Sequence, residues 1–172
     1  MTDAKQGDAE VVITPLGAGE EIALGPIQLT ILEDGSSTDH RLGLALIRIP
    51  PRTSGPPPHW HARHDEGFYV IAGTAHFLTA NGEQAAPAGT LAVVPPGAVH
   101  TFANHGDDEC VILNTFTPDL YVQYFRDLEQ LQPGPDGLLQ PPQILELMAR
   151  YGTEPYPGVA GAPMLRPNST PR

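Results

Sequence analysis

The chain has 172 residues, a mass of 18.4 kDa and a formal charge of −11, from 20 Asp and Glu against nine Lys and Arg. This length corresponds to one domain, and the negative charge would repel the phosphate backbone, so we exclude nucleic acid as a partner. A single cysteine, Cys110, excludes an internal disulfide framework and any metal site built on paired thiolates.

Two further features concern the cell compartment. No apolar stretch approaches the ~20 residues that a membrane-spanning helix needs. The first ten residues, MTDAKQGDAE, are too polar and acidic for a signal or transit peptide. We therefore expect a cytoplasmic protein with no membrane contact.

The first two thirds of the chain predict strands. Residues 1–10 are polar, and we expect a flexible N-terminus there. Apolar, β-branched runs then alternate with turns rich in Gly, Pro and Asn, which is typical of a sandwich or barrel. These runs cover residues 11–14, 27–32, 42–49, 68–72, 75–79, 91–94, 99–103 and 111–116. Asn81-Gly82 predicts a hairpin between the strands on either side of it.

The pattern changes after Pro118. Apolar residues spaced three and four apart over residues 120–131 predict an amphipathic helix. A second helix is predicted at about residues 142–151, because proline precedes an apolar stretch and Gly152 follows it. We assign residues 11–152 to the domain and residues 153–172 to a Pro-rich tail, disordered or lying on a neighbour. The fold class is all-β, with two short C-terminal helices.

Six of the seven histidines lie within residues 59–105. His59 and His61 are two residues apart in an extended segment, so their side chains share one face. Glu66 follows after a short turn, at the start of the next strand, and His100 follows the turn at Pro95-Pro96-Gly97. Three imidazoles and one carboxylate would suit a divalent first-row metal with positions left open.

Two segments carry a more specific pattern. HWHARHDEGFYVIAG has the form H-x-H, four residues, E, six residues, G. GTLAVVPPGAVHTFAN has the form G, five residues, P-x-G, two residues, H, three residues, N. They resemble the two conserved motifs of the cupin superfamily, which they match at His59, His61, Glu66, Gly73, Gly89, Pro95, Gly97, His100 and Asn104. The glycine that usually opens the first motif falls at Thr53, so we expect an altered loop there.

This resemblance implies a double-stranded β-barrel of the jelly-roll type with one divalent transition metal ion on His59, His61, Glu66 and His100. The ligands do not distinguish Fe, Mn, Ni, Co, Cu and Zn. Residues 40–155 look most similar to small cupins related to quercetin dioxygenase. That similarity implies a metal-dependent dioxygenase acting on an aromatic or polyphenolic, flavonol-like small molecule. It also implies Glu66 as the catalytic base and a homodimer.

Two other functions fit the same residues. One is a non-redox, metal-dependent polyketide cyclase or isomerase, and the other is a cupin that only binds a small ligand. Strand alternation predicts that Phe68, Val70 and Phe102 face the interior, which favours a hydrophobic substrate over a phosphate or a dicarboxylate.

The remaining candidates receive structural interpretations. His64 is expected to face solvent or to support a ligand, and Asp65 to occupy the turn or to orient a ligating imidazole. Arg48 is expected in an outward salt bridge rather than at a substrate anion. Asn104 is interpreted as a structural residue at a strand end, and Cys110 as a small buried hydrophobe.

Overall fold

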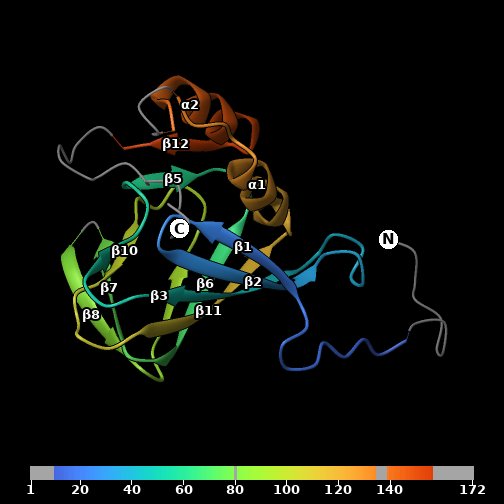
Figure 1. Ribbon diagram of the computed structural model, residues 1–172, viewed down its shortest axis with the longest axis horizontal. Coiled ribbons are helices and arrows are strands. Elements are labelled where there is room, and N and C mark those ends of the chain that lie inside the picture. Colours follow the sequence, from blue (N-terminus) through green and yellow to red (C-terminus); the bar gives the residue numbers. More distant parts are fainter. Residues whose placement is uncertain (1–9, 80, 135–138, 157–172) are drawn as a thin grey trace, which may run out of the picture.

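The computed structural model describes residues 10–79, 81–134 and 139–156 (Figure 1). Two sheets face each other as in a double-stranded barrel of the jelly-roll type, although the described strands do not join into one closed hydrogen-bonded ring. The predicted flexible N-terminus at residues 1–9 and residues 157–172 of the predicted tail lie outside the described residues.

The strands are arranged as follows. The six-stranded sheet contains, in order, β1 (Glu20–Leu24), β2 (Ile27–Asp34), β3 (Gly43–Ile49), β11 (Cys110–Thr117), β6 (Asp65–Ala72) and β9 (Leu91–Val94). The four-stranded sheet contains β4 (Thr53–Ser54), β10 (Thr101–Asn104), β7 (Thr74–Thr79) and β8 (Gly82–Pro87). A separate pair is formed by β12 (Thr153–Pro155) and β5 (His59–His61).

Alternation of buried and exposed side chains places the core between the two sheets. In β3 and β11, and in β6 as far as Val70, every second residue is buried, as period-two patterning requires. Phe68 of β6 lies 5.4 Å from Phe77 of β7 and 5.7 Å from Phe102 of β10, measured between ring centroids. Burying each such side chain contributes about 1.5–3 kcal/mol, so these rings fasten one sheet to the other.

Two helices cover one end of the sheets, beside β5 and β12 (Figure 1). They are α1 (Leu120–Glu129) and α2 (Pro141–Arg150), within about two residues of the predicted helices. Arg126 of α1 donates to Glu20 of β1 over 2.9 Å and to Asp34 of β2 over 3.0 Å, which ties this helix to the first hairpin. Neither described helix is long and apolar enough to cross a membrane.

The structure differs from the sequence prediction at three places. Residues 11–14 form no strand, and the side chains of Val11 and Ile13 are 89% and 81% exposed. β1 was not predicted, because two Glu residues open it and leave too short an apolar run. β12 lies beyond the domain boundary predicted at residue 152, since its backbone pairs with β5. The hairpin predicted at Asn81-Gly82 is present between β7 and β8.

Candidate metal centre

Strand β5 positions the first two predicted ligands. The imidazoles of His59 and His61 both point inward and are 8% and 0% exposed, whereas Trp60 between them is only partly buried. The backbone N–H of His59 donates to the carbonyl oxygen of His100 over 3.1 Å, and the reverse bond measures 2.9 Å. This bridge places ligands from distant parts of the sequence side by side.

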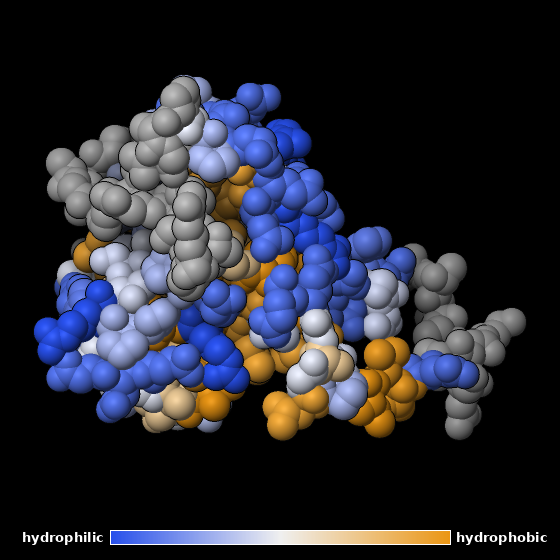
Figure 2. Space-filling view, viewed as in Figure 1, coloured by the Kyte–Doolittle hydropathy of each residue, from blue (hydrophilic) through white to orange (hydrophobic). Residues whose placement is uncertain are grey.

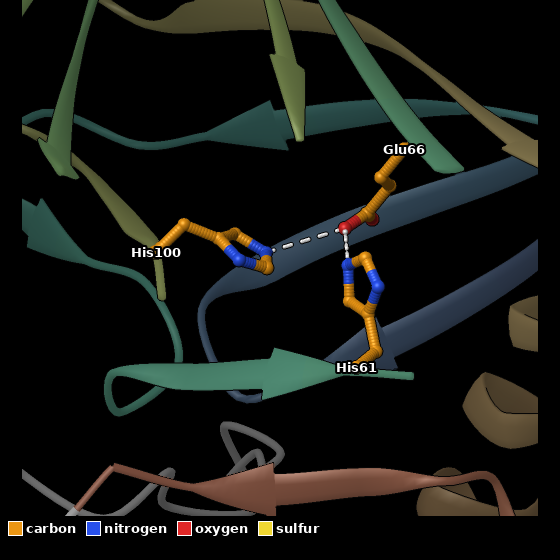
Figure 3. Close-up of side chains that lie close together, drawn as sticks. All are labelled: His61, Glu66 and His100. Atoms are coloured by element: carbon orange, nitrogen blue, oxygen red, sulfur yellow. Dashed lines mark hydrogen bonds and ion pairs between the residues drawn. The ribbon is translucent and has the colours of Figure 1, made fainter. Parts of the chain in front are cut away.

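Glu66, the second residue of β6, lies between two imidazoles (Figure 3). Its Oε2 atom is 3.0 Å from Nε2 of His61 and 3.3 Å from Nε2 of His100. The candidate ligand atoms of these three buried residues all lie within 4.8 Å of one another. The structure therefore brings three of the four predicted ligands into one compact group.

His59 lies beside this group rather than within it. Its ring centroid is 4.5 Å from that of His100 and 6.4 Å from that of His61. Its Nδ1 is 2.9 Å from the carbonyl oxygen of Pro57, and Nδ1 of His100 is 3.1 Å from that of Ala98. Because a carbonyl only accepts, each Nδ1 carries a proton, and Nε2 of His59 therefore keeps a free lone pair, as in metal-binding histidines whose other ring nitrogen donates to a carbonyl. His59 stays a predicted ligand.

The pKa values of Glu66 and His59 are shifted toward the protonation states that bind metals. Burial acts to raise the pKa of Glu66, but hydrogen bonds from His100 and His61 outweigh it and hold the pKa below its usual range. Burial, followed by the neighbouring charge of His100, lowers the pKa of His59 to about 4. At neutral pH Glu66 is therefore a carboxylate and the neighbouring His59 a neutral imidazole, which are the forms that bind metals.

These residues fit a divalent transition metal ion. Imidazole nitrogens and a carboxylate oxygen are donors that first-row divalent metals accept, without selecting among them. The Glu66 carboxylate is only 3% exposed, and a buried charge is costly unless it is paired. A cation held by Glu66, His61 and His100 would compensate that charge and engage the two imidazoles that already converge on it.

His64 is more deeply buried than the sequence suggested. Its side chain is 1% exposed, so the expectation that it faces solvent is wrong. Its ring stacks on that of His61, with centroids 3.9 Å apart and planes at 19°, and lies 4.2 Å from the ring of Tyr121. Neither ring nitrogen has a hydrogen-bond partner among the described residues. Burial, followed by the charge of His61, lowers the pKa of His64 to about 4. The ring thus supports a predicted ligand by packing.

The structure also shows the contacts and burial of the other candidate residues. Arg48 forms the expected outward ion pair, 3.0 Å from Glu109. Asn104 donates to three carbonyl oxygens, of Ile49, Pro50 and Asp108, as a structural residue would. Asp65 is exposed at the first position of β6. Cys110 is buried, and burial raises its pKa to about 11.

A cavity of about 350 Å³ opens from the histidine and glutamate cluster toward the helices. Its wall in the barrel includes Phe68 and Phe102, and α1 contributes Tyr121, Tyr124 and Phe125. The described residues that line it include no Arg or Lys. Figure 2 shows hydrophobic side chains (orange) in the middle of the visible face, below the helices. The candidate metal ligands therefore face an aromatic, largely apolar space.

Sequence reasoning missed two residues of this cavity. Asn114 of β11 is 1% exposed and is one of the lining residues. A polar residue at an inward position of VILNTFT was the available signal. Tyr121 lies within the helix predicted at residues 120–131 but was not assigned to the site; it lines the cavity, and its hydroxyl hydrogen-bonds with the hydroxyl of Thr153 in β12. This bond joins α1 to the strand beside β5.

The fold and the site together define the class of protein. Residues 45–116 match the sequence model of the Cupin domain family, and this span includes His59, His61, Glu66 and His100. Residues 45–116 therefore form a cupin domain, as the two motifs predicted.

Solved cupin structures share this fold. KdgF from Halomonas sp. is 20% identical with a TM-score of 0.55, over 62% of this chain and 94% of that one. A predicted oxalate decarboxylase from Thermotoga maritima is 19% identical with a TM-score of 0.55, over 63% and 99%. A cupin-superfamily sugar phosphate isomerase from Silicibacter pomeroyi is 26% identical with a TM-score of 0.49. The match covers 54% of this chain and only 59% of that protein. No curated protein matches the chain significantly.

The metal content of ligand variants tests the site. We expect His59→Ala and His100→Ala to lose the bound ion while keeping a folded barrel, because the core is built from other side chains. Elemental analysis of purified protein gives the metal content, and circular dichroism gives the fold. His105→Ala, at a histidine paired with Glu83 on the surface, is the matched control and should keep its metal. Full metal content in both ligand variants would place the site elsewhere.

The pH dependence of stability tests the burial of His64. The pKa of His64 is about 4 in the folded chain, against 6.5 for an unperturbed histidine, so below pH 6.5 the unfolded chain binds a proton that the folded chain does not. This contribution lowers stability as the pH falls from about 6.5 to about 4, by roughly 3 kcal/mol. In metal-free protein, His64→Leu should therefore show a shallower loss of stability over this range, measured by urea denaturation.

The control for this measurement has the opposite sign. The hydrogen bond that His40 Nδ1 donates to Oδ2 of Asp119, 2.8 Å away, followed by the charge of Asp119, raises the pKa of His40. Its contribution is present at low pH and is lost as the pH rises through the folded pKa. His40→Gln should therefore lose stability more steeply on acidification than the unmodified chain. Equal slopes in His64→Leu and the unmodified chain would contradict the buried, neutral state of His64.

Proposed function

We propose that the chain is a metal-dependent dioxygenase acting on an aromatic or polyphenolic small molecule. The observation that carries this proposal is the position of the buried Glu66, His61 and His100 cluster next to an aromatic, largely apolar cavity. Cavities of this size and lining accept small hydrophobic ligands with a few polar groups. The similarity of residues 40–155 to quercetin dioxygenase-related cupins points in the same direction.

The lining also bears on the substrate class. A phosphate is commonly bound by Arg or Lys side chains, and the described lining residues include neither. Phe68 and Phe102 instead offer ring faces to an aromatic substrate.

In this proposal Glu66 is the base. When bound, the metal ion would lower the pKa of a substrate hydroxyl, which is about 10 in a free phenol, and would pass electrons from the substrate to dioxygen. The lowered pKa of Glu66 means that it starts as a carboxylate, the form that can accept the hydroxyl proton. The aromatic wall excludes water, so that the proton remains on the carboxylate rather than passing to bulk solvent.

The same atoms would support a reaction without oxygen. A polyketide cyclase or an isomerase would use the same proton transfer to Glu66, and a binding cupin would use the cavity alone. Oxygen consumption separates these functions, because only the dioxygenase requires it.

Oxygen uptake is therefore the test. Protein loaded separately with iron, manganese, nickel, cobalt, copper or zinc is mixed with a panel of flavonols and catechols, and oxygen is followed with an electrode. We expect uptake with at least one redox-active metal. Glu66→Gln should reduce its rate by about 10²-fold or more, because the base is lost, whereas His105→Ala should match the unmodified chain. No uptake in protein holding one ion per chain would overturn the dioxygenase in favour of the oxygen-independent functions.

We also propose a homodimer. Tyr69, Ile71, Leu91 and Val93 are 44–63% exposed on the outer face of β6 and β9, and Tyr69 pairs directly with Leu91. Neighbouring exposed apolar side chains of this kind often mark a protein interface. The cytoplasmic location stays a prediction from the polar first ten residues.

Light scattering tests the dimer. The unmodified chain should have twice the mass of the 18.4 kDa monomer, and the double variant Leu91→Lys with Val93→Lys should be monomeric, since it places two charges in the interface. Ile13→Lys, at an exposed apolar residue away from these strands, should stay dimeric. A monomeric unmodified chain would refute the proposal.

A further inference from the structure

Strand β11 carries a polar side chain on its inner face. The inward positions of Cys110–Thr117 are occupied by Cys110, Ile112, Asn114 and Phe116, all of them buried. Asn114 is 1% exposed and lies opposite Phe68 of β6. An amide among hydrocarbon and aromatic neighbours is costly unless both of its polar atoms have partners.

Only one of those atoms has a partner. Nδ2 of Asn114 donates to the carbonyl oxygen of Gly67 over 3.1 Å. Because a carbonyl can only accept, the amide nitrogen must face Gly67, and this determines the orientation of the amide. Oδ1 has no hydrogen-bond partner among the described residues, although buried polar atoms nearly always have one. An acceptor is therefore available.

Asn114 lines the same cavity as Glu66 and His100. On the adjacent strand Glu66 pairs with Phe116, and Phe68 pairs with Asn114. Glu66 and Asn114 are thus diagonal neighbours on one face, a relation that separates such residues by about 7 Å. A flat molecule of one or two aromatic rings spans this distance.

We propose that Asn114 is a specificity-determining residue whose Oδ1 accepts a hydrogen bond from a second hydroxyl of an aromatic ligand. The first hydroxyl of that ligand would lie at the Glu66 end of the cavity. The substrate class is then an aromatic diol or polyphenol rather than a simple phenol. This inference rests on the proposed function in that the ligand is taken to be aromatic and to occupy this cavity.

The test compares ligands that differ by one hydroxyl. The dissociation constants of 2-naphthol and of a panel of dihydroxynaphthalenes are measured by calorimetry on metal-free protein and on protein loaded with zinc, which is redox-inactive. We expect at least one diol to bind about fivefold to tenfold tighter than 2-naphthol, the gain typical of one buried hydrogen bond. Asn114→Leu should reduce this preference to about one, because the acceptor is removed.

Two further variants separate recognition from structural support. Asn114→Asp has the same shape, and burial favours its protonated form, which can donate to the carbonyl oxygen of Gly67 and keep one acceptor oxygen, so the diol preference should persist. Ile112→Val removes a methylene from a buried neighbour on β11 without touching the amide, and should also keep the preference. No preference in the unmodified chain, or its equal loss in Asn114→Leu and Asn114→Asp, would overturn the role of Oδ1.

The binding test of Asn114 and the oxygen-uptake test of the dioxygenase can fail independently. A diol preference that requires Asn114, together with no oxygen uptake under any metal, would support this residue's role while overturning the dioxygenase. Oxygen uptake, together with a diol preference that does not depend on Asn114, would support the dioxygenase and overturn the role of Asn114.

Discussion

A carboxylate buried in an apolar barrel is the constraint on which the centre of this protein depends. Glu66 is 3% exposed, and its charge has to be compensated inside the fold, because water cannot do so. Two imidazoles converge on its Oε2 atom, one from β5 and one from the segment before β10. The backbone bridge between His59 and His100 holds those two segments together. The chain thus provides both the negative charge and the nitrogen donors that fit a divalent cation.

The rest of the fold gives this centre a closed apolar surrounding. The sheets contribute Phe68 and Phe102, and α1 contributes an aromatic group above them. The ion pairs of Arg126 with Glu20 and Asp34 hold α1 against the first hairpin. The hydrogen bond between the hydroxyls of Tyr121 and Thr153 joins the same helix to β12. In a low-dielectric space of this kind, electrostatic effects at Glu66 are stronger than they would be in water.

Much of the fold could be predicted because its determinants are local. Alternation in residues 42–49 and 111–116 located two central strands, and Asn81-Gly82 located a hairpin. The prediction was wrong for residues 11–14, where three apolar residues in a row find no partner strand. It also missed β1, whose pairing with β2 along its whole length supplies the stability that its own sequence lacks. Strand formation depends on the neighbour as much as on the strand itself.

By itself, the sequence determined the class of fold and the residues of the candidate site, since the spacing of His59, His61, Glu66 and His100 is a local property of two short segments. Only the tertiary structure decided which of these atoms converge, that His64 stacks on His61, and that Asn114 lines the cavity with an amide oxygen that has no partner among the described residues. Such contacts join residues that are distant in the chain or separated by a turn. They follow from strand pairing and helix docking, which leave no periodic signal in the sequence.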